Sequence, residues 1–211
     1  MQKVRSKLSF FATILIVIGA MLIAGSFGIN YMQYRAKQKQ IEAFDKAREK
    51  AKKNSSGENT SDDADADAGK KEKKAGAELP EGVLCVLRIP RIDSADPVKE
   101  GVTKSALAAS LGHEPDTVLP GTVGNCVIAG HRNYTFGKFF NRLDEMEVGD
   151  LLYVDTLTDT FAYRVKEVKV VEPTEVSILE NTPNEQLTLY TCTPIYVATH
   201  RLVIIAERIY E

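Results

Sequence analysis

The sequence predicts a mostly β domain, an antiparallel barrel or sandwich with few short helices, preceded by a single transmembrane helix. Three observations support this prediction. An uncharged apolar run lies near the N-terminus, and a charged segment poor in large apolar residues follows it. From residue 82 onward, short runs rich in Val, Ile, Leu and Tyr alternate with turn residues, which is the pattern of successive strands. Many strands with few helices favour a barrel or a sandwich.

The apolar run predicts a membrane helix. No charged residue occurs between positions 8 and 34. Residues 8–29 would form a helix of about 33 Å at ~1.5 Å per residue, which spans a bilayer core of roughly 30 Å. A cleaved signal peptide has a shorter apolar core of about 7–15 residues. We therefore expect an uncleaved signal anchor over 8–34 with a short cytoplasmic tail, 1–7. A buried core helix is disfavoured because no polar face interrupts the run.

The flanking charges alone do not fix the orientation of this helix. Lys3, Arg5 and Lys7 precede it and favour a cytoplasmic N-terminus, but a larger number of basic residues follow between 35 and 53. Counted directly, the positive-inside rule favours the opposite orientation, although the rule weakens where a long domain follows the span. The expected cytoplasmic N-terminus rests on the function inferred below.

A charged stalk and linker, 35–80, are expected to separate the anchor from the domain. Residues 35–53 are rich in helix formers with few apolar positions, which predicts a solvated helix. Residues 54–80 have almost no large apolar side chains to offset the entropy of ordering, which predicts a disordered linker. The remaining region, 81–211, is long enough for one core.

Within this domain the apolar runs predict six strands and two helices. The expected strands are 83–89, 126–129, 151–154, 161–171, 187–192 and 202–208. The expected helices are 103–110, with Thr and Ser near its ends, and 136–146, with apolar residues at three-to-four spacing.

Charge and cysteine spacing exclude several classes of function. A net charge of -2 at pH 7 gives no indication of nucleic-acid binding. The three cysteines contain no CxxC pair, so a zinc site is not expected. Cys85 and Cys126 lie inside apolar runs and are expected in the core. The odd count leaves at least one free thiol.

The third cysteine lies where a side chain can face a cleft. Cys192 ends an apolar strand, because Pro194 cannot donate to a sheet. A reactive thiolate needs a nearby base or cation. His131 also follows a strand, after Gly130, and Arg201 opens the last strand, where its guanidinium could stabilise an oxyanion.

Structural roles remain open for these residues on spacing alone, since a lone histidine or arginine is more often structural than catalytic. His113 is expected in a loop. His200 precedes Arg201 and should face away from any cleft that Arg201 lines.

Five short motifs closely resemble the sortase family. They are residues 119–121 (LPG), 124–125 (GN), 128–132 (IAGHR), 188–194 (TLYTCTP) and 199–203 (THRLV). Their order and rough spacing agree with the family across about 81–211. The resemblance implies an eight-stranded closed β-barrel with short helices.

The resemblance also implies a cysteine transpeptidase with named site residues. Cys192 resembles the nucleophile, His131 the general acid/base and Arg201 the group that steadies the substrate carbonyl and oxyanion. Thr191 resembles the threonine beside the nucleophile and is expected to contact substrate or shape the site. No metal or cofactor is expected.

The implied substrates are surface proteins with an LPxTG-like C-terminal signal. The implied amine acceptor is a lipid-linked peptidoglycan precursor or a pilin lysine. The implied location is a Gram-positive cell membrane, with a single span and an extracellular catalytic domain. A membrane tether would raise the effective concentration of such an enzyme at its substrates.

The subclass and the competing functions stay open. The motifs around Cys192 look similar to class C sortases, which typically carry an Asp-Pro-aromatic lid element and often a second membrane span. Here Val98 follows Asp96-Pro97, and the chain to Glu211 shows no second apolar run, so a class D-like or other single-anchor sortase is favoured. A papain-like peptidase would place its cysteine before its histidine, and the Ser-x-Gly-Cys motif of L,D-transpeptidases is absent. A membrane-anchored binding domain would leave Cys192 inert.

Overall fold

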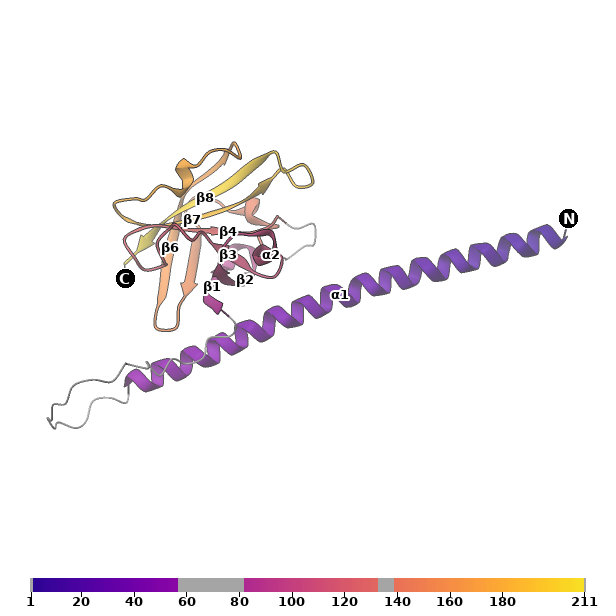
Figure 1. Ribbon diagram of the computed structural model, residues 1–211, viewed down its shortest axis with the longest axis horizontal. Helices are drawn as coiled ribbons and strands as arrows, with labels where there is room; N and C mark the ends of the chain where they lie inside the picture. The colour runs from indigo at the N-terminus through magenta and orange to yellow at the C-terminus, as the bar shows by residue number, and fades with distance from the viewer. Residues whose placement is uncertain (1, 57–81, 133–138, 211) are drawn as a thin grey trace. The chain divides into compact units, whose positions relative to one another are not determined.

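The computed structural model describes residues 2–56, 82–132 and 139–210 (Figure 1). The chain divides into two compact units, Met1–Lys39 and Gln40–Glu211. Each unit is described by itself.

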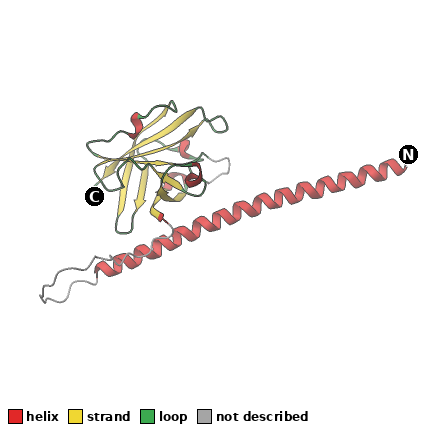
Figure 2. Cartoon of the chain, in the orientation of Figure 1, coloured by secondary structure: helices red, strands yellow, loops and turns green. Residues whose placement is uncertain are grey.

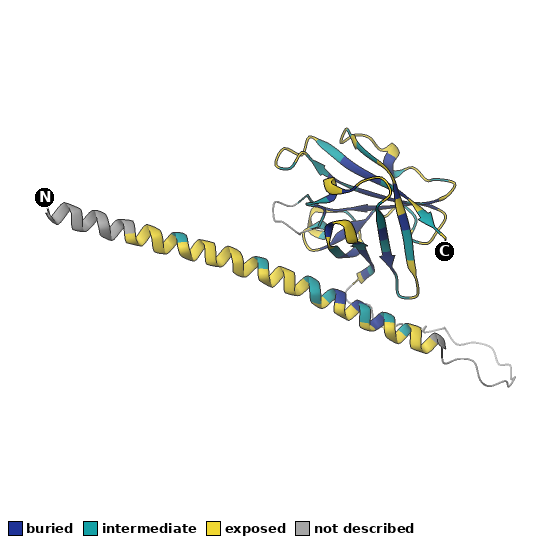
Figure 3. Cartoon of the chain, turned by 180° about the vertical axis from the view of Figure 1, so that it is seen from behind, coloured by how far each residue is buried: buried dark blue, intermediate teal, exposed yellow. Residues whose placement is uncertain are grey.

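The first unit is the apolar part of helix α1 (Gln2–Ser56). A stretch of this helix is long and apolar enough to cross a membrane, and none of its most apolar window is buried by protein. Leu15, Leu22 and Phe27 are each about 70% exposed. The described part of this helix before residue 40 is mostly yellow, the colour of exposed residues, in Figure 3. This exposure does not fit the core helix of a soluble domain, which the sequence also disfavoured.

The last part of α1, residues 40–56, belongs to the second unit. The expected helix is confirmed here, but the expectation that it is solvated is wrong for one face. Ile41, Phe44 and Ala47 recur every three residues and are all buried. Phe44 packs with Val83 at the start of the barrel. Most of the predicted linker, from residue 57, lies outside the described residues.

The second unit contains a closed barrel of eight strands, which confirms the expected fold. Strands are the main regular secondary structure of this unit (Figure 2). In chain order they are β1 (Val83–Ile89), β2 (Ser94–Glu100), β3 (Leu111–His113), β4 (Gly124–Ala129), β5 (Leu151–Asp155), β6 (Thr160–Val171), β7 (Glu185–Thr193) and β8 (His200–Ile209). Around the barrel the order is β1-β2-β3-β4-β7-β8-β6-β5. Neighbours are antiparallel except β2 with β3 and β4 with β7.

All six predicted strands are present, and two strands were missed. β2 contains Asp96 and Pro97, which are depleted in strands, and β3 has only three residues. Both strands are held by the barrel rather than by their own composition. Pro97, for example, pairs with Val86 of β1.

The two predicted helices are only partly correct. α2 (Lys104–Leu107) is shorter than predicted, and the Thr103 side chain caps its first turn. The helix predicted over 136–146 is wrong for its described part. Phe139 has φ 49°, a left-handed conformation that interrupts a helix, and only a short 3-10 turn, η3 (Leu143–Glu145), follows. The apolar spacing reflected burial of Phe140, Leu143 and Met146 in the core.

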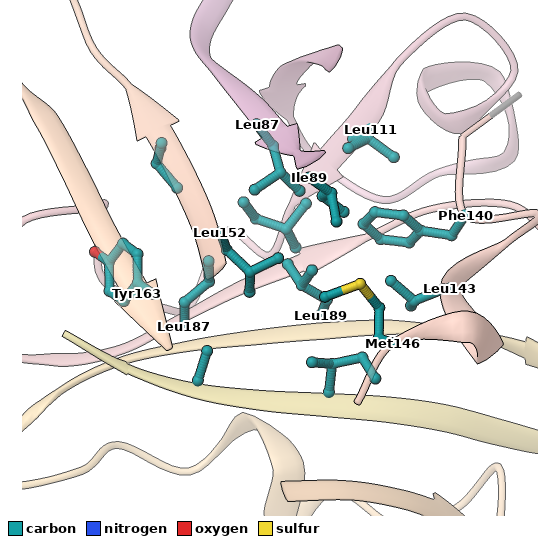
Figure 4. Packing of buried hydrophobic residues seen from close by; sticks show 14 of the residues in the cluster. Leu87, Ile89, Leu111, Phe140, Leu143, Met146, Leu152, Tyr163, Leu187 and Leu189 are labelled. Atoms are coloured by element: carbon teal, nitrogen blue, oxygen red, sulfur yellow. The ribbon is translucent and has the colours of Figure 1, made fainter. Parts of the chain in front are cut away.

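The core lies inside the barrel (Figure 4). It includes Leu87, Leu152 and Leu189 from different strands. Cys85 and Cys126 are each 1% exposed, which confirms their predicted place. Burial, with the charge of Asp155, raises the pKa of the Cys85 thiol to about 12. Burial also raises the pKa of Cys126.

Candidate active site

Cys192 lies near the end of β7, beside Arg201 of β8. β7 ends at Thr193, immediately before Pro194, as the sequence predicted. Cys192 and Arg201 are direct partners across the antiparallel β7–β8 pair. Such partners share one face of the sheet, with Cβ atoms about 4.5–5.5 Å apart. The thiol and the guanidinium therefore project side by side, and the backbone carbonyl of His200 accepts a 3.1 Å hydrogen bond from Arg201.

His131 follows β4, which runs parallel to β7. The ladder between these strands ends with Ala129 opposite Tyr190. The Gly130 amide then donates to the Tyr190 carbonyl at 3.2 Å. A Cβ atom on Gly130 would lie 2.6 Å from side-chain atoms of Leu111 and of Phe140, so only glycine fits. The hydrogen bond from Gly130 to Tyr190 places the next residue, His131, at the end of β7.

The three predicted catalytic residues line one cleft of about 300 Å³. Other lining residues come from three places: the segment after β2, the β4–β7 floor and the β6–β7 connection. They are Val102, Leu107, Ala129, Gly130, Pro173, Glu175, Val176, Ile178, Leu179, Tyr190 and Thr191. The cleft combines apolar side chains with a thiol, a histidine and an arginine. The apolar side chains could hold an apolar side chain of a peptide while a carbonyl of that peptide reacts at the thiol.

Thr191 lines the cleft but is 1% exposed. Its hydroxyl donates to the Gly130 carbonyl at 2.7 Å. Its expected contact with substrate stays a prediction.

The other two histidines are not among the described residues that line the cleft. His113 is 3% exposed and ends β3, so the expectation of a loop is wrong. Its ring nitrogens lie 3.1 Å from a Glu100 carboxylate oxygen and 3.0 Å from the Val118 carbonyl oxygen. His200 lies 3.2 Å from Glu172 and faces away from the cleft, as predicted from strand alternation.

Sequence reasoning assigned no role to Asn125, which anchors a wall of the cleft. Its side-chain amide donates to the carbonyls of Ile178 and Glu180 at 2.9 and 3.0 Å. Its oxygen accepts from buried Thr188 at 2.7 Å. Asn125 thereby holds η4 (Ser177–Leu179) of the β6–β7 connection. In the sequence, only the motif of Gly124 and Asn125 pointed to this position.

Tyr190 was also missed. Its ring lines the cleft and its hydroxyl donates to Glu114 at 2.5 Å. Burial, followed by this hydrogen bond, raises the pKa of Tyr190, so the phenol stays a donor. The bond fixes the ring in the floor of the cleft.

A family model for the sortase domain matches residues 87–209, more than half of the chain. This protein belongs to the sortase family. The barrel, and the cleft with its cysteine, agree with that assignment. Sortases are cysteine transpeptidases.

Three relatives show the extent of the similarity. Sortase D of Bacillus subtilis is 29% identical over 198 residues, covering 92% of this sortase and 96% of its own chain. Sortase SrtE1 of Streptomyces coelicolor is 29% identical over 144 residues, covering 61% of this chain but only 41% of its own. The crystal structure of sortase C-1 from Streptococcus pneumoniae has a TM-score of 0.60 at 34% identity and covers 68% of this chain and 75% of its own.

Proposed function

We propose that this sortase cleaves an LPxTG-like sorting signal through Cys192 and transfers the resulting acyl group to an amine. The observation that carries the proposal is the convergence of Cys192, His131 and Arg201 in one cleft. The two other cysteines are buried in the core, so Cys192 is the thiol that can meet a substrate.

The first stage forms an acyl-enzyme. The Cys192 thiolate attacks the carbonyl carbon of the scissile peptide bond, and a carbon–sulfur bond forms. Arg201 donates hydrogen bonds to the oxyanion that develops. His131 gives a proton to the leaving nitrogen as the carbon–nitrogen bond breaks. The products are a thioester and the free C-terminal tail of the substrate.

The second stage transfers the acyl group. An incoming amine attacks the thioester and loses a proton to His131. The carbon–sulfur bond breaks, and the thiolate is restored. Two smaller barriers thus replace one large one. The proposed acceptor amine belongs to a lipid-linked peptidoglycan precursor or to a pilin lysine.

The proposed location is a Gram-positive cell membrane, with the N-terminus in the cytoplasm and the catalytic domain, 81–211, outside. Helix α1 supports an anchor because it is long and apolar enough to span a bilayer. Residues 40–56, which pack on the barrel, are proposed to support the domain.

A class D-like subclass is favoured over a class C-like one. The similarity to sortase D extends over 92% of this chain. Asp96 and Pro97 lie in the barrel strand β2, where Asp96 is 1% exposed, and this strand position does not suit a lid.

The test uses the full chain in detergent with LPxTG-like peptides and an amine nucleophile, with products read by mass spectrometry. A joined product that disappears in Cys192→Ala is expected. His131→Ala is expected to lose activity, whereas His200→Ala, outside the cleft, is expected to retain it. Cleavage without joining would indicate a hydrolase. Joining that survives Cys192→Ala would refute the assigned nucleophile.

A further inference from the structure

The β4–β7 ladder stops short of the catalytic residues. Its last pair is Ala129 with Tyr190, and the last main-chain bond is from Gly130 to Tyr190. His131 and Cys192 both lie beyond this point. In the described part of the chain, the further contacts between the two segments are made by side chains that flank the catalytic pair.

One flanking contact precedes the catalytic residues and the other follows them. Thr191, just before Cys192, donates to the carbonyl of Gly130, just before His131, at 2.7 Å. Arg132, just after His131, donates from a terminal guanidinium nitrogen to the hydroxyl of Thr193, just after Cys192, also at 2.7 Å.

Arg132 is itself held. Its side chain is 9% exposed, and its second terminal nitrogen lies 2.8 Å from a carboxylate oxygen of Asp144. The planar guanidinium therefore joins Thr193 to Asp144, with one terminal nitrogen for each partner. A lysine ammonium is a point charge without this fork.

The face from which these contacts are made leaves the thiol free. Successive strand residues point to opposite faces, so Thr191 and Thr193 project away from the face of Cys192. The contacts can fix the backbone on either side of Cys192 while the Cys192 side chain stays on the other face of the strand.

We propose that Arg132 is a positioning residue that, through Thr193, sets the separation between the acid/base His131 and the nucleophile Cys192. Thr191 and Gly130 form the other half of the same clamp. The inference rests on the proposed catalytic roles of His131 and Cys192. A misplacement of about 1 Å between reacting groups can lower a rate by roughly 100-fold, so loss of one half of the clamp should act mainly on kcat.

The experiment compares four variants of the full chain in detergent: Thr193→Val, Thr193→Ser, Arg132→Lys and Asp144→Asn. Thr193→Val removes the hydroxyl at nearly constant shape and is expected to lower kcat about 10- to 100-fold with KM changed less than about 3-fold. Thr193→Ser keeps the hydroxyl and is expected to restore kcat to within about 3-fold. Arg132→Lys keeps the charge but not the fork, and is expected to resemble Thr193→Val. Asp144→Asn keeps an acceptor for Arg132 and is expected to resemble Thr193→Ser.

Rates are expressed per molecule that alkylation modifies only once, because unfolded protein would also expose Cys85 and Cys126 and be modified more than once. The exposed Arg164, replaced by alanine, is the matched control and should leave kcat unchanged. The double variant Arg132→Lys/Thr193→Val should be no slower than the slower single variant, since both changes remove one contact.

Three results would overturn the proposal: wild-type kcat in Thr193→Val, wild-type kcat in Arg132→Lys, or multiplied losses in the double variant. Failure of the proposed function is recognised separately, because the wild-type chain would then form no joined product or Cys192→Ala would retain activity.

Discussion

Replacement of Phe44 by alanine should destabilise the catalytic unit although the residue lies in the segment predicted to be a solvated stalk. Phe44 is fully buried and packs with Val83, Val86 and Leu157. Truncation of a buried phenylalanine lowers the free energy of unfolding by about 3–5 kcal/mol. The lower value is expected here, because a docked helix can partly close the space that the ring leaves.

The assay is thermal unfolding of a shortened chain, residues 40–211, which keeps the whole compact unit. At about 2–4 °C per kcal/mol for a chain of this size, the expected fall in Tm is roughly 6–12 °C. Lys46→Ala, at an exposed position two residues away, is the control and should change Tm by less than about 2 °C.

A second comparison removes the helix altogether. Residues 81–211 alone would expose Val83 and Val86, which are both fully buried in the complete unit. This fragment should melt at or below the temperature of Phe44→Ala. Docking of the helix would be refuted if Phe44→Ala and the fragment both melted within about 1 °C of residues 40–211.

Three further predictions concern the thiols, acid stability and the cleft wall. Iodoacetamide should modify Cys192 alone in the folded protein, because burial protects Cys85 and Cys126; mass spectrometry of labelled peptides would detect a second site, which would contradict their core placement. Burial would raise the pKa of Asp155, but hydrogen bonds and ion pairs from arginines outweigh burial and lower this pKa. The ionised Asp155 carboxylate therefore stabilises the fold above about pH 4, and this stabilisation is lost as the pH falls through the lowered pKa. The Tm difference between wild type and Asp155→Asn should therefore shrink below pH 4, and a difference that is constant from pH 6 to pH 3 would refute this. Asn125→Ala should raise KM for the peptide more than it lowers kcat, because the β6–β7 wall is released; an unchanged KM in the peptide assay would count against the anchor.

The helix docking could be predicted only in part from the sequence. Ile41, Phe44 and Ala47 recur every three residues, which is a real but narrow apolar stripe within a highly charged segment. The ion pairs that join this helix to the barrel involve residues distant in the chain: Arg48 lies 3.0 Å from Asp155, and Arg88 contacts both Asp45 and Asp155. Ion pairs across such separations leave no local pattern.

The apolar spacing over 136–146 shows the opposite error. Phe140, Leu143 and Met146 are buried as a helical stripe would be, yet the backbone turns irregularly at Phe139. Periodicity reported which side chains enter the core but not the path of the chain. β3 was missed for a related reason, because its pairing with β2 and β4 comes from barrel closure and not from its own three residues.

The convergence of the three predicted residues in one cleft followed from motifs that extend beyond those residues. Cys192 and His131 alone would have been two isolated residues of uncertain role. Their neighbours Thr191 and Arg132 contact the opposite segment, so each motif contains one proposed catalytic residue and one contact beside it. Under the proposed roles, residues adjacent in sequence to Cys192 and His131 constrain the distance between them. This explains why the short motifs around positions 131 and 192 carried the inference. The motif at 124–125 was also visible, but the role of Asn125 depends on the main chain of a distant connection and could not be derived from that motif.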